Sequence, residues 1–272
     1  MPLIDLSQLH VGDVLLEPGI EKIAANTGRA ENRFGHASLA LGRLVRIHAP
    51  GPGKIAVVEP FELRTWIRAD SKLEGFQVKG DAIVLRPRTS IREIDIWAGA
   101  QWQAGSPYAS ADKLAELIDL TPHARSFLRS ERGQEFLERI ARRGVPLSQE
   151  GRSCGELVAS ILSLGEENVS PNTLVGHPNF ETVRNAVVPE EGWEDDGPHP
   201  GAPELNELLG RYHQDTSRRV WLQTVEAAAK GLSSADEEAL LETYRDELGE
   251  QLEDNYDILG EVESLAGEIF GF

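Results

Sequence analysis

The chain has 272 residues and a formal net charge of −18, which is unevenly distributed along the sequence. Residues 190–272 contain 22 acidic and 5 basic residues, whereas residues 1–189 are nearly neutral. Because neither of these two parts has a basic surplus, these numbers exclude a nucleic-acid binder that works by neutralising phosphates. No apolar run reaches the roughly 18 residues of a membrane-spanning helix, so no integral membrane segment is expected.

Two features bear on the compartment of the protein. The first residues lack the basic segment and apolar run that mark a signal peptide, so a cytoplasmic location is the default expectation. Export by a route without a cleaved signal would leave the same sequence. The only cysteine, Cys154, excludes an intrachain disulfide and any metal site made of several cysteines.

The first ninety residues predict a small antiparallel sheet, because short apolar runs are separated by turns that contain glycine and proline. The predicted strands cover residues 11–16, 36–42, 44–49, 54–58 and 81–86. The second and third of these strands are so close in sequence that they can only form a hairpin. Between the last two, residues 62–69 have apolar residues at helical spacing and predict a short helix.

From residue 91 onward the apolar residues recur at helical spacing, which predicts helices in place of strands. The predicted helices lie just after residue 91, within residues 110–143 and over residues 154–164. Ser170 followed by Pro171 is a further helix-start signal.

The distribution of prolines and charges predicts two domains. Residues 189–203 combine prolines with an acidic run and predict a linker. Before it, residues 1–188 predict an α+β domain, a small antiparallel sheet packed on helices, with a helical insertion at 110–150. After it, residues 204–272 predict an acidic, all-helical domain. Its acidic helices are either a solvated face or a surface for a protein partner or for self-association.

Cys154 lies in the sequence Ser153-Cys-Gly-Glu156, where Ser153 and Glu156 have the spacing of a helix capping box. This spacing predicts that Cys154 is the first residue of a helix. A sulfur at that position lies near unpaired backbone N–H groups and the positive end of the helix dipole, which both favour the thiolate. A thiolate beside a base is a nucleophile. The alternative is a small buried side chain at the start of a core helix.

Two of the seven histidines, His36 and His48, lie in the predicted hairpin and are the candidate bases. Whether they meet depends on the turn between the strands. A two-residue turn at Gly42-Arg43 places them on opposite faces of the sheet. A three-residue connection, residues 42–44, pairs His48 with Ser38 and makes His36 its diagonal neighbour on the same face, at roughly 7–8 Å between backbones. Both turns are compatible with the sequence.

The run His36-Ala-Ser-Leu-Ala-Leu-Gly42, followed by Val45-Arg-Ile-His-Ala49, resembles the histidine hairpin of NlpC-type papain-like cysteine peptidases. The helix start Cys154-Gly-Glu-Leu-Val158 is similar to the cysteine motif of the same superfamily. Because the histidines here precede the cysteine, the resemblance is to the circularly permuted branch, which includes lecithin:retinol acyltransferase-like proteins. Together with Val11-Gly-Asp-Val14 and Ser170-Pro-Asn-Thr-Leu174, these motifs cover about residues 10–180.

The resemblance implies a cysteine hydrolase in which Cys154 is the nucleophile, His36 is the base and His48 orients His36. In several permuted members a glutamate on a neighbouring strand orients the base, so Glu59 is the alternative. A contact of Tyr108 with the oxyanion or the substrate is also implied. This chemistry requires no metal and no organic cofactor.

For the substrate, the resemblance implies an amide in a cell-wall-type peptide. A lipid or fatty-acyl ester, which is hydrolysed or whose acyl group is transferred, is the alternative. Two further hypotheses are a non-enzymatic interaction protein and an exported antibacterial effector.

Overall fold

The computed structural model describes residues 1–18, 34–50, 56–78, 80–106, 152–165 and 169–211, together with residues 261, 262, 264–268 and 270. The chain divides into two compact units, residues 1–199 and residues 200–272, and each is described by itself. Among the described residues, no helix is both long and apolar enough to cross a membrane.

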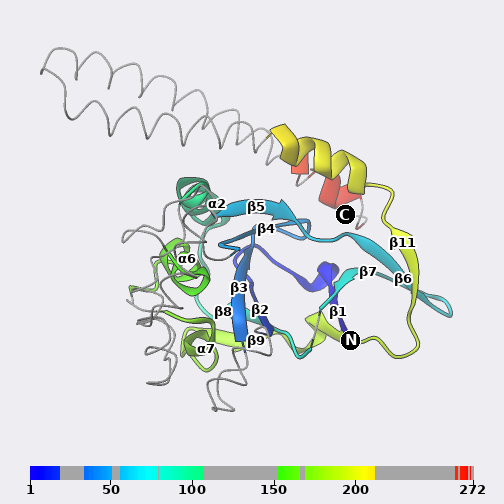
Figure 1. The fold of residues 1–272 in the computed structure, drawn as a ribbon, viewed down its shortest axis with the longest axis horizontal. Coiled ribbons are helices and arrows are strands. Elements are labelled where there is room, and N and C mark those ends of the chain that lie inside the picture. Colours follow the sequence, from blue (N-terminus) through cyan, green and yellow to red (C-terminus); the bar gives the residue numbers. More distant parts are fainter. Residues whose placement is uncertain are drawn as a thin grey trace, which may run out of the picture. The chain divides into compact units, whose positions relative to one another are not determined.

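The first unit is an α+β structure made of two antiparallel sheets and a few short helices (Figure 1). The six-stranded sheet has the order β5-β4-β3-β2-β8-β9 and consists of β2 (Val14–Pro18), β3 (Phe34–Ala40), β4 (Val45–His48), β5 (Val57–Pro60), β8 (Ile83–Pro87) and β9 (Phe180–Thr182). The five-stranded sheet has the order β10-β1-β7-β6-β11 and consists of β1 (Pro2–Asp5), β6 (Arg64–Arg68), β7 (Ser71–Gln77), β10 (Val187–Pro189) and β11 (Glu194–Pro198). The described helices of the first unit are η1 (Leu6–Gln8), α2 (Glu93–Gln103), α6 (Cys154–Ile161), α7 (Pro171–Leu174) and η2 (Arg184–Ala186).

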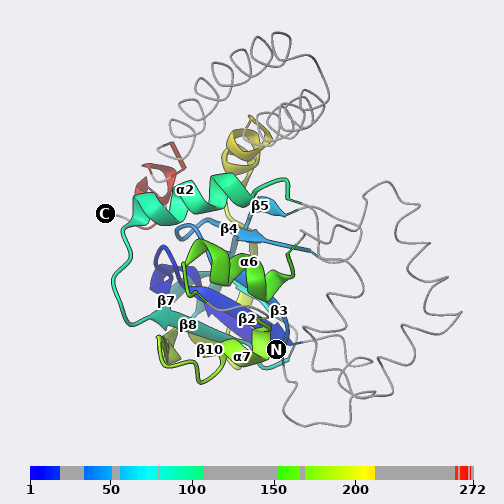
Figure 2. The ribbon, with the colours of Figure 1, turned by 90° about the vertical axis from the view of Figure 1, so that its left-hand side faces the viewer.

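The α-helices and the five-stranded sheet lie on opposite sides of strands β2, β3 and β8 (Figures 1 and 2). Helix α6 packs against β3 and β4, α2 packs against α6, and α7 packs against β3. The α+β class predicted from the sequence is confirmed, because an antiparallel sheet packs on helices.

Strand alternation gives the six-stranded sheet one uniformly apolar face and one face on which apolar and polar residues are mixed. Val14, Leu39 and Ile47 are paired across β2, β3 and β4, and all three are fully buried on one face. The residues that alternate with them, among them His36 and His48, therefore lie on the other face.

The predicted strands are present as β2, β3, β4, β5 and β8, but the helix predicted at residues 62–69 is wrong. Residues Arg64–Arg68 form β6, which pairs with β7 on one side and with β11 on the other. At its centre, Thr65, Trp66 and Ile67 are β-branched or aromatic residues, which fit a pleated sheet better than a helix. Pairing on both sides then supplies the backbone hydrogen bonds that decide the structure.

Residues 189–203 are not a linker over their whole length, as the sequence predicts. Strand β11 lies within this segment and pairs with β6, and the Asp195 carboxylate accepts two hydrogen bonds from the Arg64 guanidinium. The acidic run is therefore part of a sheet, and the first unit extends to His199 instead of ending at residue 188.

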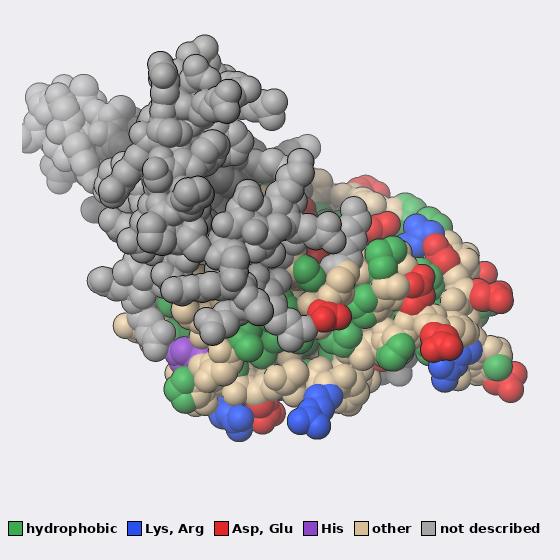
Figure 3. Space-filling view, turned by 60° about the horizontal axis from the view of Figure 1, so that its bottom comes forward, with side chains coloured by type: hydrophobic (Ala, Val, Ile, Leu, Met, Phe, Trp, Pro, Cys, Tyr) green, Lys and Arg blue, Asp and Glu red, His purple; other side chains and the backbone are tan. Residues whose placement is uncertain are grey.

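Charged side chains of opposite sign lie next to one another on the face of the molecule drawn in Figure 3. Two exposed pairs of this kind in the first unit are Arg88 with Glu181, at 3.5 Å, and Arg92 with Asp95, at 2.7 Å. Solvent and salt screen exposed pairs such as these, so they contribute little to stability. The pairing of opposite charges on this unit agrees with the nearly neutral net charge of residues 1–189.

In the second unit, residues 202–211 and the described residues from 261 onward are helical. Arg211 donates a hydrogen bond to the Glu261 carboxylate, so these two helical segments contact each other. The helices predicted between them, and the helical insertion predicted at 110–150, lie outside the described residues.

Gly155, the second residue of α6, lies against the backbone of Val169 and Ser170. A Cβ atom at this position would lie 2.4 Å from the Val169 carbonyl oxygen and 2.9 Å from the Ser170 carbonyl carbon. Real Cβ atoms do not approach backbone atoms this closely. The start of α6 is therefore held at a fixed place by a contact that only glycine permits.

We expect Gly155→Ala to lower the free energy of unfolding by about 2 kcal/mol, because the added methyl group overpacks the start of α6. Urea unfolding measures this change. The control is Gly210→Ala, since Gly210 is helical and has no atom within 4 Å of its Cβ position. That substitution should stabilise the helix by up to about 1 kcal/mol. Equal stability of Gly155→Ala and the wild type would contradict the close packing.

Candidate active site

The hairpin of β3 and β4 has the three-residue connection 42–44. A hydrogen bond of 2.9 Å from the Leu41 N–H to the Val45 carbonyl closes it. The first residue of the connection is a glycine with a φ of 141°, a backbone conformation that glycine adopts most easily. The resulting register pairs His48 with Ser38, which is the second of the two registers compatible with the sequence.

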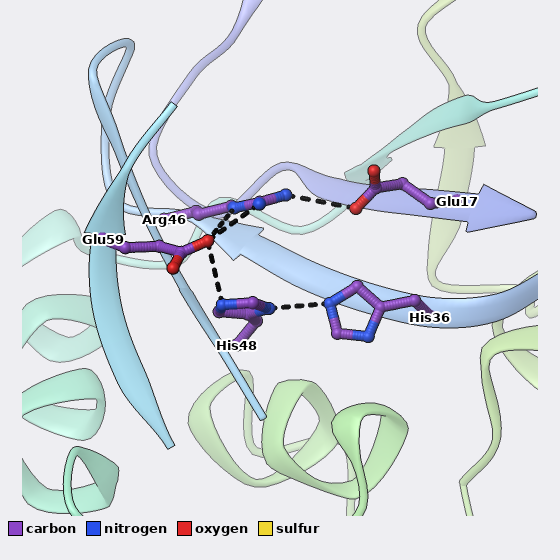
Figure 4. A network of polar contacts seen from close by, with 5 residues as sticks. All are labelled: Glu17, His36, Arg46, His48 and Glu59. Atoms are coloured by element: carbon purple, nitrogen blue, oxygen red, sulfur yellow. Dashed lines mark hydrogen bonds and ion pairs between the residues drawn. The ribbon is translucent and has the colours of Figure 1, made fainter. Parts of the chain in front are cut away.

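His36 on β3 and His48 on β4 contact each other through their rings (Figure 4). His36 Nε2 lies 2.8 Å from His48 Nδ1, and the rings meet edge to face with 5.0 Å between their centroids. His48 is 7 % exposed. At this distance the two nitrogens form a hydrogen bond, in which one ring donates and the other accepts.

Glu59 on β5 is the second partner of His48. Its Oε1 lies 3.0 Å from His48 Nε2. The His48 N–H does not point straight at this oxygen, so the contact is short but is not a well-aligned hydrogen bond. The sequence predicts either His48 or Glu59 as the residue that orients His36. In the structure the two lie in series, because His48 contacts His36 and Glu59 contacts His48.

These contacts determine where the protons lie when both rings are neutral. The ionised Glu59 carboxylate favours a proton on His48 Nε2, the nitrogen that faces it. His48 Nδ1 is then an acceptor, so His36 Nε2 must hold the proton of the shared hydrogen bond. His36 Nδ1 therefore keeps its lone pair and is a base.

Glu59 is ionised at neutral pH although it is partly buried. Burial alone would raise the pKa of its carboxyl group. Its interactions with His48 and with the Arg46 guanidinium outweigh this effect and lower the pKa to about 2. A permanent negative charge therefore lies at one end of the histidine pair.

His36 is neutral at neutral pH. Burial, together with the nearby His48 and Arg46, lowers the pKa of His36 from 6.5 to about 3, and the charge of Glu59 opposes this shift. The neutral ring is the form that can accept a proton. Protonation of His36 becomes favourable when a negative charge arises beside it.

Cys154 is the first residue of α6, as the capping box predicts. The Ser153 hydroxyl accepts from the Glu156 N–H at 3.3 Å, and the Glu156 carboxylate accepts from the Ser153 N–H at 3.0 Å. Cys154 is 3 % exposed, at the beginning of a helix that packs against β3 and β4. In Figure 4, α6 is the green helix below the histidine pair, on the side to which His36 Nδ1 points.

Helix α7 supports the strand that carries His36. The Asn172 side chain accepts from the Phe34 N–H at 3.0 Å and donates to the Phe34 carbonyl at 2.8 Å. Phe34 pairs with Pro18, the last residue of β2, so Asn172 continues the hydrogen bonding of β3 where β2 ends. The sequence predicts a helix start at Ser170-Pro171 but does not single out Asn172, whose partner lies 138 residues away.

Cys154, His36, His48 and Glu59 are the predicted site residues for which the structure gives a position. They lie on α6, β3, β4 and β5. Tyr108, the predicted contact for the oxyanion or the substrate, lies outside the described residues.

Comparisons with known proteins yield no match. No protein-family model and no curated protein matches the sequence, and no solved structure matches the fold. The interpretation of the site therefore depends on its own geometry, in which the helix that begins at Cys154 packs against the two strands that hold the contacting His36 and His48 rings.

We expect acid to destabilise the protein through His36. Because folding lowers the pKa of His36 from 6.5 to about 3, the unfolded chain binds a proton in this interval that the folded chain does not. Stability therefore falls as the pH falls, by on the order of 2 kcal/mol between pH 6.5 and pH 4.5. The corresponding loss from Glu59 begins only below pH 4.5, because its pKa is lowered from 4.5 to about 2.

Urea unfolding of the wild type and of His36→Gln at pH 6.5 and pH 4.5 measures this contribution, which should be absent from the variant. His10→Gln replaces an exposed histidine and should retain the wild-type pH dependence. The same pH dependence in His36→Gln and in the wild type would contradict the lowered pKa.

Proposed function

We propose that the protein is a cysteine hydrolase of the circularly permuted papain-like kind, in which Cys154 is the nucleophile and His36 the base. One observation carries the proposal: α6, which begins at Cys154, packs on the two strands that hold the contacting His36 and His48 rings. A base whose second nitrogen is held by a hydrogen-bonded partner is the arrangement that activates a nucleophile. The motifs that resemble the permuted branch support the same assignment.

In the proposed first step, His36 Nδ1 accepts the proton of the Cys154 thiol. The imidazolium formed keeps its Nε2–H bond to His48, and the Glu59 charge stabilises it through His48. The thiolate then attacks the carbonyl carbon of the substrate and forms a carbon–sulfur bond. Collapse of the tetrahedral intermediate expels an amine or alcohol, which takes the proton from His36. Water, deprotonated by His36, hydrolyses the thioester and regenerates the thiol.

The carbonyl oxygen becomes negatively charged in these steps and needs hydrogen-bond donors. The first turn of α6 provides backbone N–H groups and the positive end of the helix dipole next to Cys154. Donors fixed in this way are a large part of the stabilisation of such intermediates. We propose the Cys154 N–H as one donor and the Tyr108 hydroxyl as a second.

We propose a peptide-like amide of the cell-wall type as the substrate. This choice follows the resemblance of the histidine hairpin and the cysteine motif to the papain-like peptidases. The same nucleophile and base would act on an acyl ester, so the assay for the substrate must include both classes.

The nucleophile can be tested before the substrate is known. Cys154 is the only cysteine, so a thiol reagent reports on this residue alone. We expect iodoacetamide to alkylate Cys154 at pH 7 at least about tenfold faster than glutathione, since only a few per cent of an ordinary thiol is ionised at this pH. Replacing His36 by Gln should remove most of the enhancement, and replacing Glu59 by Gln should remove part of it. Mass spectrometry of the intact protein measures the rates.

His10→Gln is the matched control for these variants and should alkylate at the wild-type rate, because His10 is exposed. Alkylation of the wild type no faster than glutathione, together with no effect of His36→Gln, would show that the proposal is wrong.

For the substrate, we expect the wild type to release soluble peptides from purified peptidoglycan and the Cys154→Ala variant to release none. Phospholipid vesicles are incubated in parallel, and chromatography with mass spectrometry identifies the products. Release of fatty acid in place of peptides would assign the enzyme to acyl esters. Release of neither by the wild type would count against both substrates.

A further inference from the structure

Arg46 lies on β4, two residues before His48, and its guanidinium bridges two carboxylates (Figure 4). Its Nη2 and Nε donate to Glu59 Oε1 at 2.8 Å and 3.2 Å, and its Nη1 donates to Glu17 Oε2 at 3.1 Å. Glu59 Oε1 is also the oxygen that contacts His48 Nε2. Arg46 therefore holds the atom on which the orientation of His48 depends.

The strand register explains how one side chain reaches both carboxylates. Arg46 pairs with Glu59 on β5 and with Ala40 on β3, whereas Glu17 lies on β2, beyond β3. Because neighbouring strands are about 4.8 Å apart, two long side chains are needed to meet across β3. The small side chains of Ser38 and Ala40, on the same face of β3, leave room for them.

The two carboxylates exceed the charge of Arg46 by one negative charge. The side chains of Arg46, Glu17 and Glu59 are 17 %, 25 % and 34 % exposed, so solvent screens their interactions only in part. If Arg46 were paired with Glu59 alone, it would cancel the charge that stabilises a protonated His36. Glu17 supplies a second negative charge, which leaves Glu59 able to act on the histidine pair.

We propose that Arg46, balanced by Glu17, is a positioning residue of the site. It fixes Glu59 Oε1 against His48 Nε2 and so selects the His48 tautomer that leaves His36 Nδ1 as the base. The effect of Arg46 on Cys154 rests on the proposed function, whereas its effect on the His48 tautomer does not. Two measurements therefore test the inference.

The first measurement is the alkylation rate of Cys154 in the full chain. We expect Arg46→Met and Glu59→Gln each to lower the rate about tenfold, and the double variant to be no slower than Glu59→Gln, because residues that act through one another are not additive. Arg46→Lys should recover part of the rate, since lysine keeps the charge but lacks the planar fork that binds two carboxylates.

The second measurement is nitrogen-15 NMR of the histidine rings at pH 7, which a merely structural role of Arg46 would not change. The wild type should carry the His48 proton on Nε2, and Arg46→Met should contain both tautomers. Arg64→Met removes another carboxylate-paired arginine, in the five-stranded sheet, and should change neither the rate nor the tautomer. Urea unfolding identifies a variant that has lost its fold, in which case Arg46→Lys replaces Arg46→Met.

Either of two results would overturn the inference. One is a wild-type alkylation rate and a wild-type His48 tautomer in Arg46→Met. The other is a double variant in which the losses from Arg46→Met and Glu59→Gln multiply. If instead His36→Gln does not slow alkylation, the proposed function fails, and the tautomer in Arg46→Met still decides the role of Arg46.

Discussion

The register of the β3–β4 hairpin is the constraint on which the candidate site depends. Its three-residue connection pairs His48 with Ser38 and brings His48 to the face that carries His36. With a connection one residue shorter, His48 would pair with Ala37 and lie on the face of Leu39, opposite to His36, so the two rings could not meet. The alternation that buries the apolar side chains of the sheet therefore also gathers its histidines and charged residues on the opposite face.

In the series of contacts His36–His48–Glu59–Arg46–Glu17, the neutral rings lie at one end and the charged groups at the other. His36 and His48 are rings that share one hydrogen bond while neutral, and His48 is buried. The charges lie at the more exposed end, where the Glu59 and Glu17 side chains are 34 % and 25 % exposed and flank the guanidinium of Arg46. A base can thus be kept neutral inside the fold without leaving an unpaired charge there.

The features that the sequence predicts correctly are encoded within a few residues, as in the capping box at Ser153-Cys-Gly-Glu156 and the hairpin that holds the histidines. The register of that hairpin could not be predicted, because both turns suit the residues. Arg46 and its partner Glu17 form no local motif, since they lie 29 residues apart. None of the strands of the five-stranded sheet is predicted from the sequence, for a related reason. Strand β11 consists of Glu-Asp-Asp-Gly-Pro, a composition that disfavours strands, and only its pairing with β6 makes it one.

The topology of the five-stranded sheet also constrains how the protein folds during synthesis. Strand β1 lies between β7 and β10, and Leu3 pairs with Val188, so the sheet joins residues from opposite ends of the first unit. On the ribosome, β1 keeps one unpaired edge until β10 has emerged from the exit tunnel. Synthesis must pass Pro189, the last residue of β10 in a chain of 272 residues, before this edge is covered. Over that interval the nascent chain must be protected from pairing with a neighbouring polypeptide.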